Sequence, residues 1–463
     1  MMDSPIAKCL RKCVLASGLS VFAPIIASVT HARAETAVDQ GVEDYVREEL
    51  PPGINVSVNE LEGPVFIDSA GKTLYFWPIR SLRNGDTGDR KNSPSNCTGE
   101  VMKESSGLMS PYPAGLILPD LSQRKSCQEV WPPALASEDA TTVGKWSVIP
   151  RQDGRKQWAY DGYPLYTSVL DKSPGDVLGG TRRRIGSGDE PAVRMPAGPR
   201  PNVPPAFSVR QVGTGRMIVN QTGFSVYSSD KDGPNKSNCA GPCLSKWTPV
   251  LAGRAAQPQG EWSVFERSQG VRQWAFRGKP LYTFNDDPKG RSLIGSDEPG
   301  WHNVYTQRAP AAPREFTQQD THAGIVLADG AGKTIYIYSC GDDALDQLAC
   351  DHPGSPQEYR LAVCGGGDAA RCAKTWPLVL ARKDAESPSR VWTIINIDPL
   401  SGRLTSPDAP QSVRAWAYRG RPVYTYAGDQ PGDVNGDSLG EFYGSRNGFK
   451  AFWLRDDFLN NAG

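Results

Sequence analysis

The segment Trp274-Ala-Phe-Arg-Gly-Lys-Pro-Leu-Tyr282 places large side chains on both sides of an Arg-Gly pair. Closely similar segments occupy residues 158–166, where the pair is Asp-Gly, and residues 416–424, where it is again Arg-Gly. A two-residue turn of this kind predicts a β-hairpin, because positive φ at the turn matches the twist of the flanking strands. The proline in each returning strand has no N–H to donate, so we expect it at a sheet edge or a bulge.

Cysteines, tryptophans and tyrosines around these hairpins share one register and reveal a repeat. A cysteine lies four residues before a tryptophan at Cys127 and Trp131, Cys243 and Trp247, and Cys372 and Trp376. The other tryptophans in register are Trp146 and Trp158, Trp262 and Trp274, and Trp392 and Trp416. A tyrosine lies eight residues after the last of these tryptophans in each copy, at Tyr166, Tyr282 and Tyr424. Nine of the twelve tryptophans therefore indicate three tandem copies.

An earlier hairpin opens each copy, and proline-rich runs separate the copies. Asp68–Tyr75 and Asp329–Tyr336 match in spacing, and the middle copy keeps Gly223 and Tyr227 at the same separation. Runs rich in proline indicate linkers. The expected organisation is a signal peptide at 1–34, a helix and lead-in at 35–60, repeat 1 at 61–192, a linker at 193–206, repeat 2 at 207–308, a linker at 309–315 and repeat 3 at 316–463.

The composition favours short strands, since 48 glycines and 39 prolines occur among 463 residues. We predict an all-β fold of three tandem, disulfide-braced repeats built from hairpins. An alternative is a propeller-like ring in which six half-repeats form the blades. The one helix that the sequence predicts spans Val38 to Leu50 and ends at Pro51-Pro-Gly53.

The N-terminus has the features of a secretory signal peptide. Lys8, Arg11 and Lys12 precede a largely apolar stretch, and Ala32-Arg-Ala34 supplies the small-x-small cleavage pattern. We expect a periplasmic or secreted protein without a membrane span after cleavage, because no later segment has the ~20 apolar residues that a span needs. The formal net charge of zero argues against a nucleic-acid partner.

The cysteines that remain after cleavage are even in number, which predicts disulfides in an exported chain. Cys239 and Cys243 close a short loop in the middle copy. Matching positions in the other copies pair Cys97 with Cys127 and Cys364 with Cys372, which leaves Cys340 to Cys350. Zinc is the alternative, but the spacings are not Cys-x2-Cys pairs and no histidine accompanies them.

One loop of the third copy resembles the start of a calcium-binding loop. Asp433, Asn435 and Asp437 place oxygen ligands at alternate positions, as such a loop requires. The twelfth position is Gly444 instead of the usual acid, so the loop is incomplete. A solvated turn is the alternative interpretation, and the sequence predicts no other cofactor.

The repeat resembles a bacterial secreted repeat of unknown function, which occurs in predicted lipoproteins with a Tyr-x-aromatic-x-x-Asp motif. The best matches are Tyr424-Thr-Tyr-Ala-Gly-Asp429 and Tyr282-Thr-Phe-Asn-Asp-Asp287, whereas Tyr166-Thr-Ser-Val-Leu-Asp171 lacks the second aromatic residue. The resemblance implies a periplasmic or secreted location. It supplies no activity, because the family is described without one.

We expect the protein to bind a partner through aromatic-rich β surfaces and to have no catalytic residues. More tryptophans are in register than three small cores need, and exposed aromatic rings would stack on a glycan or a periplasmic protein. The candidate ligand-binding residues are Tyr166, Tyr282, Tyr424, Trp158, Trp274 and Trp416. The alternative is that all nine tryptophans in register belong to the core.

Two other functions are consistent with the sequence. A carbohydrate hydrolase would use a pair of loop carboxylates, and the acids that could form one are Asp286, Asp287, Asp297 and Glu298. An accessory of a periplasmic redox chain would instead dock a cytochrome or a dehydrogenase.

Overall fold

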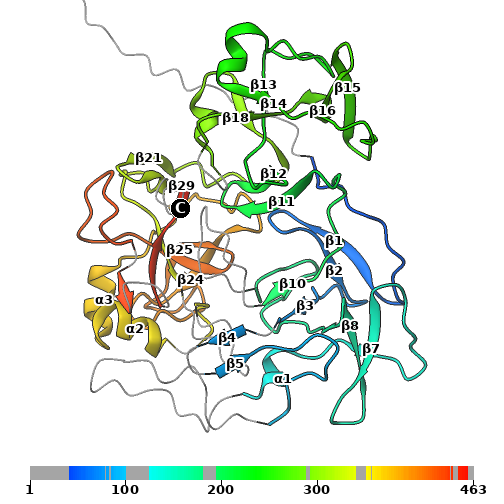
Figure 1. The fold of residues 1–463 in the computed structure, drawn as a ribbon. Helices are drawn as coiled ribbons and strands as arrows, with labels where there is room; N and C mark the ends of the chain where they lie inside the picture. The colour runs from blue at the N-terminus through cyan, green and yellow to red at the C-terminus, as the bar shows by residue number, and fades with distance from the viewer. Residues whose placement is uncertain are drawn as a thin grey trace, which may run out of the picture. The chain divides into compact units, whose positions relative to one another are not determined.

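The fold is assembled from antiparallel β-hairpins that recur in the three repeats (Figure 1). The computed structural model describes residues 41–78, 80–82, 85–100, 125–180, 194–287, 292–339, 351–355, 357–437, 439–441 and 447–456. Within these residues the structure is mostly β, with many small antiparallel sheets and few helices. The strands of the described ranges form no closed ring, so the propeller alternative is wrong. No sheet of the described residues joins a strand of one repeat to a strand of another, so no ladder connects successive blades.

Each repeat closes on itself through an opening hairpin and a short third strand. The opening hairpins are β1 (Asn55–Asn59) with β2 (Gly63–Ile67), β11 (Phe207–Val212) with β12 (Gly215–Asn220), and β21 (Thr317–Thr321) with β22 (Gly324–Ala328). The third strands are β3 (Tyr75–Phe76), β13 (Tyr227–Ser229) and β23 (Tyr336–Ser339). They pair with later strands, namely β10 (Met195–Pro196) in the predicted linker after repeat 1, β19 (Trp301–Asn303) in repeat 2 and β28 (Asn447–Ala451) in repeat 3. In repeats 2 and 3 a further late strand, β20 (Tyr305–Arg308) or β29 (Trp453–Asp456), joins the opening hairpin.

The hairpins that the Asp-Gly and Arg-Gly pairs predict are present in all three repeats. They are β8 (Lys156–Tyr160) with β9 (Tyr163–Pro164), β16 (Val271–Phe276) with β17 (Lys279–Pro280), and β25 (Val413–Tyr418) with β26 (Arg421–Tyr424). A preceding strand pairs with each, namely β7 (Trp146–Pro150), β15 (Trp262–Ser268) or β24 (Trp392–Ile397). Both turn residues have positive φ, for example 46° at Asp161 and 82° at Gly162. The twist argument for these turns is thereby confirmed.

Shorter elements connect the two halves of each repeat. The helices are α1 (Cys127–Val130), α2 (Glu358–Gly365) and α3 (Ala369–Thr375), with the 3-10 turns η2 (Gly241–Ser245) and η3 (Ile294–Asp297). The remaining strands are β4 (Arg80–Leu82), β5 (Gly85–Thr87), β6 (Leu135–Ala136), β14 (Trp247–Pro249), β18 (Tyr282–Phe284) and β27 (Gly440–Glu441). The helical turns carry the cysteine that precedes each registered tryptophan.

The segment that was expected to form a helix is extended where the structure describes it. Residues 41–50 contain no helical turn; instead Tyr45 forms a β-bridge with Pro201. The side chain of Glu43 is buried and ion-pairs with Arg216 at 2.6 Å. Satisfying this buried carboxylate from another part of the chain outweighs the weak local preference for a helix. The predicted N-terminal helix is therefore wrong over residues 41–50.

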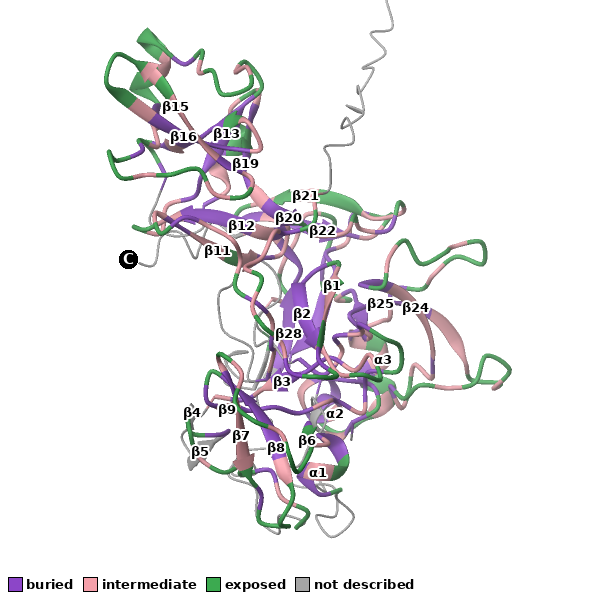
Figure 2. Ribbon diagram, turned by 90° about the vertical axis from the view of Figure 1, so that its right-hand side faces the viewer, coloured by how far each residue is buried: buried purple, intermediate pink, exposed green. Residues whose placement is uncertain are grey.

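The tryptophans in register lie in the interior, in two hydrophobic clusters per repeat. One cluster packs against the second hairpin and contains Trp146 and Trp158 in repeat 1; the other contains Trp131 and the disulfide. Repeats 2 and 3 have corresponding pairs of clusters. All nine tryptophans in register are buried. Figure 2 shows the buried residues along strands such as β2 and β8. The structure thus shows the alternative in which all nine tryptophans in register belong to the core.

Three disulfides are present among the described residues, and they join the expected partners. Cys97 is bonded to Cys127, Cys239 to Cys243, and Cys364 to Cys372. Cys340 and Cys350 lie outside the described residues, as does the signal segment 1–34. Residues 41–463 group into one compact unit, so the boundaries between repeats stay predictions. In the part of the chain that is described, no helix is long and apolar enough to cross a bilayer.

Candidate functional site: a buried tyrosine–aspartate pair in each repeat

The aspartate of the predicted motif accepts a hydrogen bond from a tyrosine in the third strand of its own repeat. Tyr75 Oη donates to Asp171 Oδ2 at 2.8 Å in repeat 1. Tyr227 Oη donates to Asp287 Oδ2 at 2.9 Å in repeat 2, and Tyr336 Oη donates to Asp429 Oδ2 at 2.5 Å in repeat 3. The pair therefore joins the end of the second hairpin to the first half of the repeat. We name it the Tyr–Asp pair.

A glycine backbone completes each Tyr–Asp pair. The N–H groups of Gly179, Gly295 and Gly436 donate to the tyrosine oxygen at 3.3, 3.4 and 3.2 Å. A side chain is not tolerated at these positions, because a Cβ on Gly295 would lie 2.7 Å from the Tyr227 ring and one on Gly436 would lie 2.8 Å from Trp376. Close approach of backbone to ring thus explains the glycine.

Aromatic contacts surround the pair in the same way in each repeat. The tyrosine of the pair lies directly across the sheet from the motif's first tyrosine: Tyr75 from Tyr166, Tyr227 from Tyr282, and Tyr336 from Tyr424. The tryptophan that follows the cysteine meets the ring edge-on, at centroid distances of 5.4 Å for Trp131, 5.3 Å for Trp247 and 5.3 Å for Trp376. This geometry is favourable for aromatic pairs and adds packing energy beyond simple burial.

The six residues proposed as ligand-binding are buried side chains of these clusters. Tyr166, Tyr282, Tyr424, Trp158, Trp274 and Trp416 are all less than 9% exposed. The structure therefore assigns them to the core, and ligand binding by them stays a prediction. The sequence did not predict that Tyr75, Tyr227 and Tyr336, together with the three glycines, belong to the site. Their signal was the glycine–tyrosine spacing of the opening hairpins.

Burial shifts the ionisation of these groups toward their neutral forms. Desolvation raises the pKa of Asp171 to about 7 and the pKa of Asp287 to about 6, against the lowering effect of the tyrosine hydrogen bonds. Desolvation likewise raises the pKa of Asp429. The pKa of Tyr75 is raised well above its usual value by burial and by the neighbouring Asp171 carboxylate. A carboxyl held near its tyrosine in this way acts as a structural acceptor, since both of its oxygens are already engaged in repeats 1 and 3.

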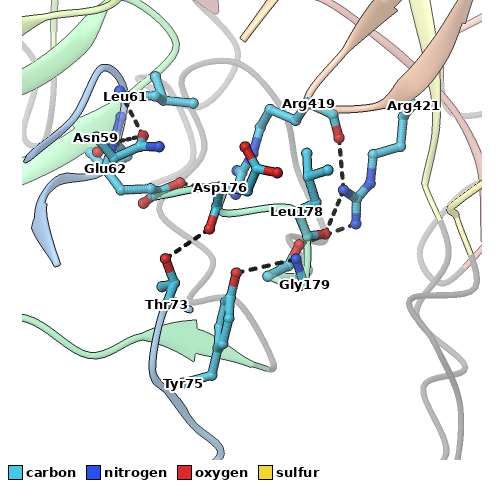
Figure 3. Close-up of polar contacts among 12 residues, drawn as sticks. Asn59, Leu61, Glu62, Thr73, Tyr75, Asp176, Leu178, Gly179, Arg419 and Arg421 are labelled. Carbon is cyan, nitrogen blue, oxygen red and sulfur yellow. Dashed lines mark hydrogen bonds and ion pairs between the residues drawn. The ribbon is translucent and has the colours of Figure 1, made fainter. Parts of the chain in front are cut away.

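In repeat 1 the loop that follows the Tyr–Asp pair also contacts repeat 3 (Figure 3). The N–H of Leu178 donates to Asp171 Oδ1 at 2.8 Å, and its carbonyl accepts from Arg421 Nη1 at 2.9 Å. Arg421 also donates to the carbonyl of Gly180 at 3.2 Å and ion-pairs with Asp351 at 3.1 Å. The backbone of Leu178 is thus hydrogen-bonded on both sides, to repeat 1 through its N–H and to repeat 3 through its carbonyl.

A second buried ion pair and an apolar contact lie at the same junction. Arg419 in the turn between β25 and β26 contacts Glu62 at 3.0 Å, and both side chains are at most one-tenth exposed. Leu61, in the turn between β1 and β2, belongs to the hydrophobic cluster that contains Trp392 and Trp416 of repeat 3. We call these contacts, together with those of Arg421, the junction.

Two of the three oxygen ligands proposed for calcium accept hydrogen bonds from the backbone. Asp433 Oδ2 accepts from the N–H of Gln430 at 2.9 Å, and Asp437 Oδ1 accepts from the N–H of Ala451 at 2.7 Å. Asn435 is exposed. The described residues contain no group of three His, Cys, Asp or Glu side chains suited to a metal ion. Calcium stays a prediction, and equal heats for wild type and Asp433→Ala in a calcium titration would remove it.

The acids considered for hydrolysis have separate partners. Asp287 accepts from Tyr227, Glu298 ion-pairs with Lys246 at 2.7 Å, and Asp297 ion-pairs with Arg455. Asp286 is exposed in the turn before Asp287. An acid–base pair needs two carboxyl groups that face one substrate. The hydrolase therefore finds no support in the contacts of these four residues.

The fold and the Tyr–Asp pairs define a disulfide-braced β-repeat protein. Residues 147–180 and 414–447 match a family described as a secreted repeat of unknown function, and the resemblance seen in the sequence is thereby confirmed for two copies. Both matched segments run from the second hairpin through Asp171 or Asp429 to the loop whose glycine contacts the tyrosine. The chain matched no curated protein and no solved structure.

Proposed function

We propose that the protein is an exported accessory protein that acts by binding another protein through an aliphatic position repeated in its three copies. The observation that carries the proposal is an exposed leucine at the same place in every repeat. Leu135, Leu251 and Leu380 each lie four residues after the cysteine-linked tryptophan, and they are 46%, 58% and 59% exposed. Exposed leucines at scattered positions need no explanation, but the same exposure at three equivalent positions suits a recurring contact.

Each of these leucines has cross-strand neighbours in the sheet of the second hairpin. Leu135, in β6, lies opposite Gln157, whose other cross-strand neighbour is Ile149. The corresponding rows are Leu251, Gln273 and Phe265 in repeat 2 and Leu380, Ala415 and Ile395 in repeat 3. Residues directly opposite in antiparallel strands share one face of the sheet. The exposed leucine and the half-buried Ile or Phe therefore lie on one face of the hairpin, on either side of a buried Gln in repeats 1 and 2 and of a buried Ala in repeat 3.

The chemistry of the exposed residues favours a protein over a glycan. All exposed large hydrophobic residues in the described ranges are leucine or valine. Sugars are recognised by stacking on aromatic rings, and the tryptophans of the repeats are buried. Aliphatic side chains instead fit the apolar centre of a protein–protein contact. The family description as a secreted repeat is consistent with a partner outside the cytoplasm.

A photo-crosslinking residue placed at 135, 251 or 380 in cells that export the protein tests this function. We expect all three positions to give an adduct with the same partner protein, identified by mass spectrometry. The matched control is position 400, because Leu400 is 50% exposed but lies in the insertion peculiar to repeat 3. The triple variant Leu135→Ser, Leu251→Ser, Leu380→Ser should weaken binding of the purified partner at least tenfold.

Either of two results would contradict the proposal. Position 400 could give the same adducts as the three repeat positions, which would show that exposure alone determines crosslinking. Alternatively, the purified protein could bind soluble polysaccharide with an affinity that the triple variant leaves unchanged. The second result would favour the glycan.

A further inference from the structure

The disulfide of repeat 3 has a guanidinium group against its sulfur. Arg360, one helical turn before Cys364 in α2, places Nη1 3.1 Å from Cys372 Sγ and 3.8 Å from Cys364 Sγ. The contacts of the other two disulfides differ in kind. Arg267 in repeat 2 donates to the carbonyl oxygen of Cys239, and Cys97 Sγ in repeat 1 lies 3.8 Å from the carbonyl of Trp131.

Arg360 is a buried cation without a close carboxylate among the described residues. Its side chain is 4% exposed; Nε donates to Gln357 Oε1 at 2.8 Å, and Nη2 has no hydrogen-bond partner. No carboxylate among the described residues lies within ion-pair distance of it, although its charge helps to lower the pKa of the nearby Asp398 against burial, which raises it. A buried charge without a close counter-ion is costly, so a new anion at this point would be stabilised.

We infer that Cys364 and Cys372 form a thiol–disulfide exchange site that takes two electrons from a thiol reductant. A neutral disulfide leaves Arg360 without a counter-ion, whereas reduction creates a thiolate 3.1 Å from its Nη1. A neighbouring cation stabilises a thiolate, and a disulfide whose reduced form is stabilised is the better oxidant. The inference goes beyond the proposed binding function and does not depend on it.

The relative exposure of the two cysteine residues suggests the order of events. Cys364 is the more exposed residue, at 7% against 1% for Cys372, so we assign the attack of the external thiolate to Cys364. A bond forms between the incoming sulfur and Cys364 Sγ, the Cys364–Cys372 bond breaks, and its electron pair stays on Cys372 Sγ beside Arg360. A second thiolate then attacks the incoming sulfur and releases the Cys364 thiolate. The protein gains two electrons, and the two thiols leave as one disulfide.

Equilibration of the folded secreted chain in glutathione buffers of graded poise tests the site. Thiols are trapped by alkylation, and each disulfide is quantified by peptide mass spectrometry. We expect Cys364–Cys372 to be reduced at a less negative potential than Cys97–Cys127 and Cys239–Cys243. Arg360→Met should shift its equilibrium at least tenfold toward the disulfide, which is about 30 mV for a two-electron couple. Arg360→Lys keeps the charge and should retain most of the effect.

Arg267→Met is the matched control, since it removes a guanidinium that contacts a cysteine carbonyl and not a sulfur. It should leave the potential of Cys364–Cys372 unchanged. If Arg360→Met does not fold, the order in which the three disulfides of the wild type are reduced still tests the site. Reduction of Cys364–Cys372 together with or after the other two pairs would overturn the inference. An equal potential in wild type and a folded Arg360→Met variant would do the same.

Discussion

Repeats 1 and 2 contain the same Tyr–Asp pair, but the loops that follow it contact repeat 3 differently. In repeat 1 the buried Arg421 donates to two carbonyls of the loop, whereas in repeat 2 the exposed Asp297 forms an ion pair with Arg455. In repeat 2 the tyrosine contacts Asp287 and the carbonyl of Ser292, both within its own repeat. In repeat 1 the loop after Asp171 continues to Leu178, whose carbonyl accepts from Arg421 of repeat 3. The comparison indicates that the Tyr–Asp pair is first a means of closing one repeat. Because the Tyr–Asp pair fixes the loop that follows it, that loop can then bind a side chain of a neighbouring repeat.

The largest expected effect comes from removing the junction arginine. Arg421→Met leaves Asp351 buried without its cation, because both side chains are 4% exposed. Loss of one partner from a buried ion pair lowers the unfolding free energy by about 3–5 kcal/mol. Urea denaturation measures the change. Arg390→Met is the control, since Arg390 also contacts repeat 1 but is 58% exposed and should change stability by less than about 1 kcal/mol. Equal effects of the two variants would contradict the role of the junction.

Removing the motif acid should distinguish the two repeats. Asp171→Ala and Asp287→Ala each leave a buried tyrosine hydroxyl without its carboxylate acceptor, which destabilises by about 1–3 kcal/mol. Asp171→Ala should be the more harmful, because Asp171 also accepts from Leu178 and so positions the carbonyl that Arg421 binds. The measurement is again urea denaturation. A smaller loss in Asp171→Ala than in Asp287→Ala would show that the loop does not depend on the pair.

The stability should fall as the pH rises, in a range set by the two acids. The folded pKa of Asp171, about 7, lies above the usual value of 3.8, so the folded state binds more protons than the unfolded state between these values. Stability from this group is fully present below about pH 4 and is lost as the pH rises through 7. Asp171 alone should remove about 1 kcal/mol between pH 6 and pH 8. Asp171→Asn should flatten this part of the profile, while Asp287→Asn should act nearer pH 6. A stability that rises between pH 6 and pH 8 would contradict the assignment.

The local features of the fold could be predicted from the sequence, because they depend on residues close together in the chain. The turns at Asp161-Gly162 and its counterparts need only positive φ, and the pairing of Cys239 with Cys243 spans four residues. The helix expected over residues 38–50 failed where it is described, because Glu43 is paired with Arg216, far along the chain. Local propensity could not anticipate that partner.

The candidate site was harder to predict because its halves are distant in sequence. Tyr75 and Asp171 are 96 residues apart, and Tyr227 and Asp287 are 60 apart. The surplus of tryptophans suggested exposed rings because one core per repeat was assumed. The structure instead distributes the tryptophans of each repeat over two clusters, on either side of the third strand, and in repeat 1 these accommodate Trp131 as well as Trp146 and Trp158.

A double-mutant cycle on Tyr75 and Asp171 tests most directly whether the motif acid closes its repeat. The unfolding free energies of Tyr75→Phe, Asp171→Asn and the double variant are compared with that of the wild type, and the same cycle is made with Tyr227 and Asp287. Direct contact predicts a coupling energy of about 1 kcal/mol or more in both repeats. Additive effects, with a coupling energy near zero in both cycles, would contradict the account.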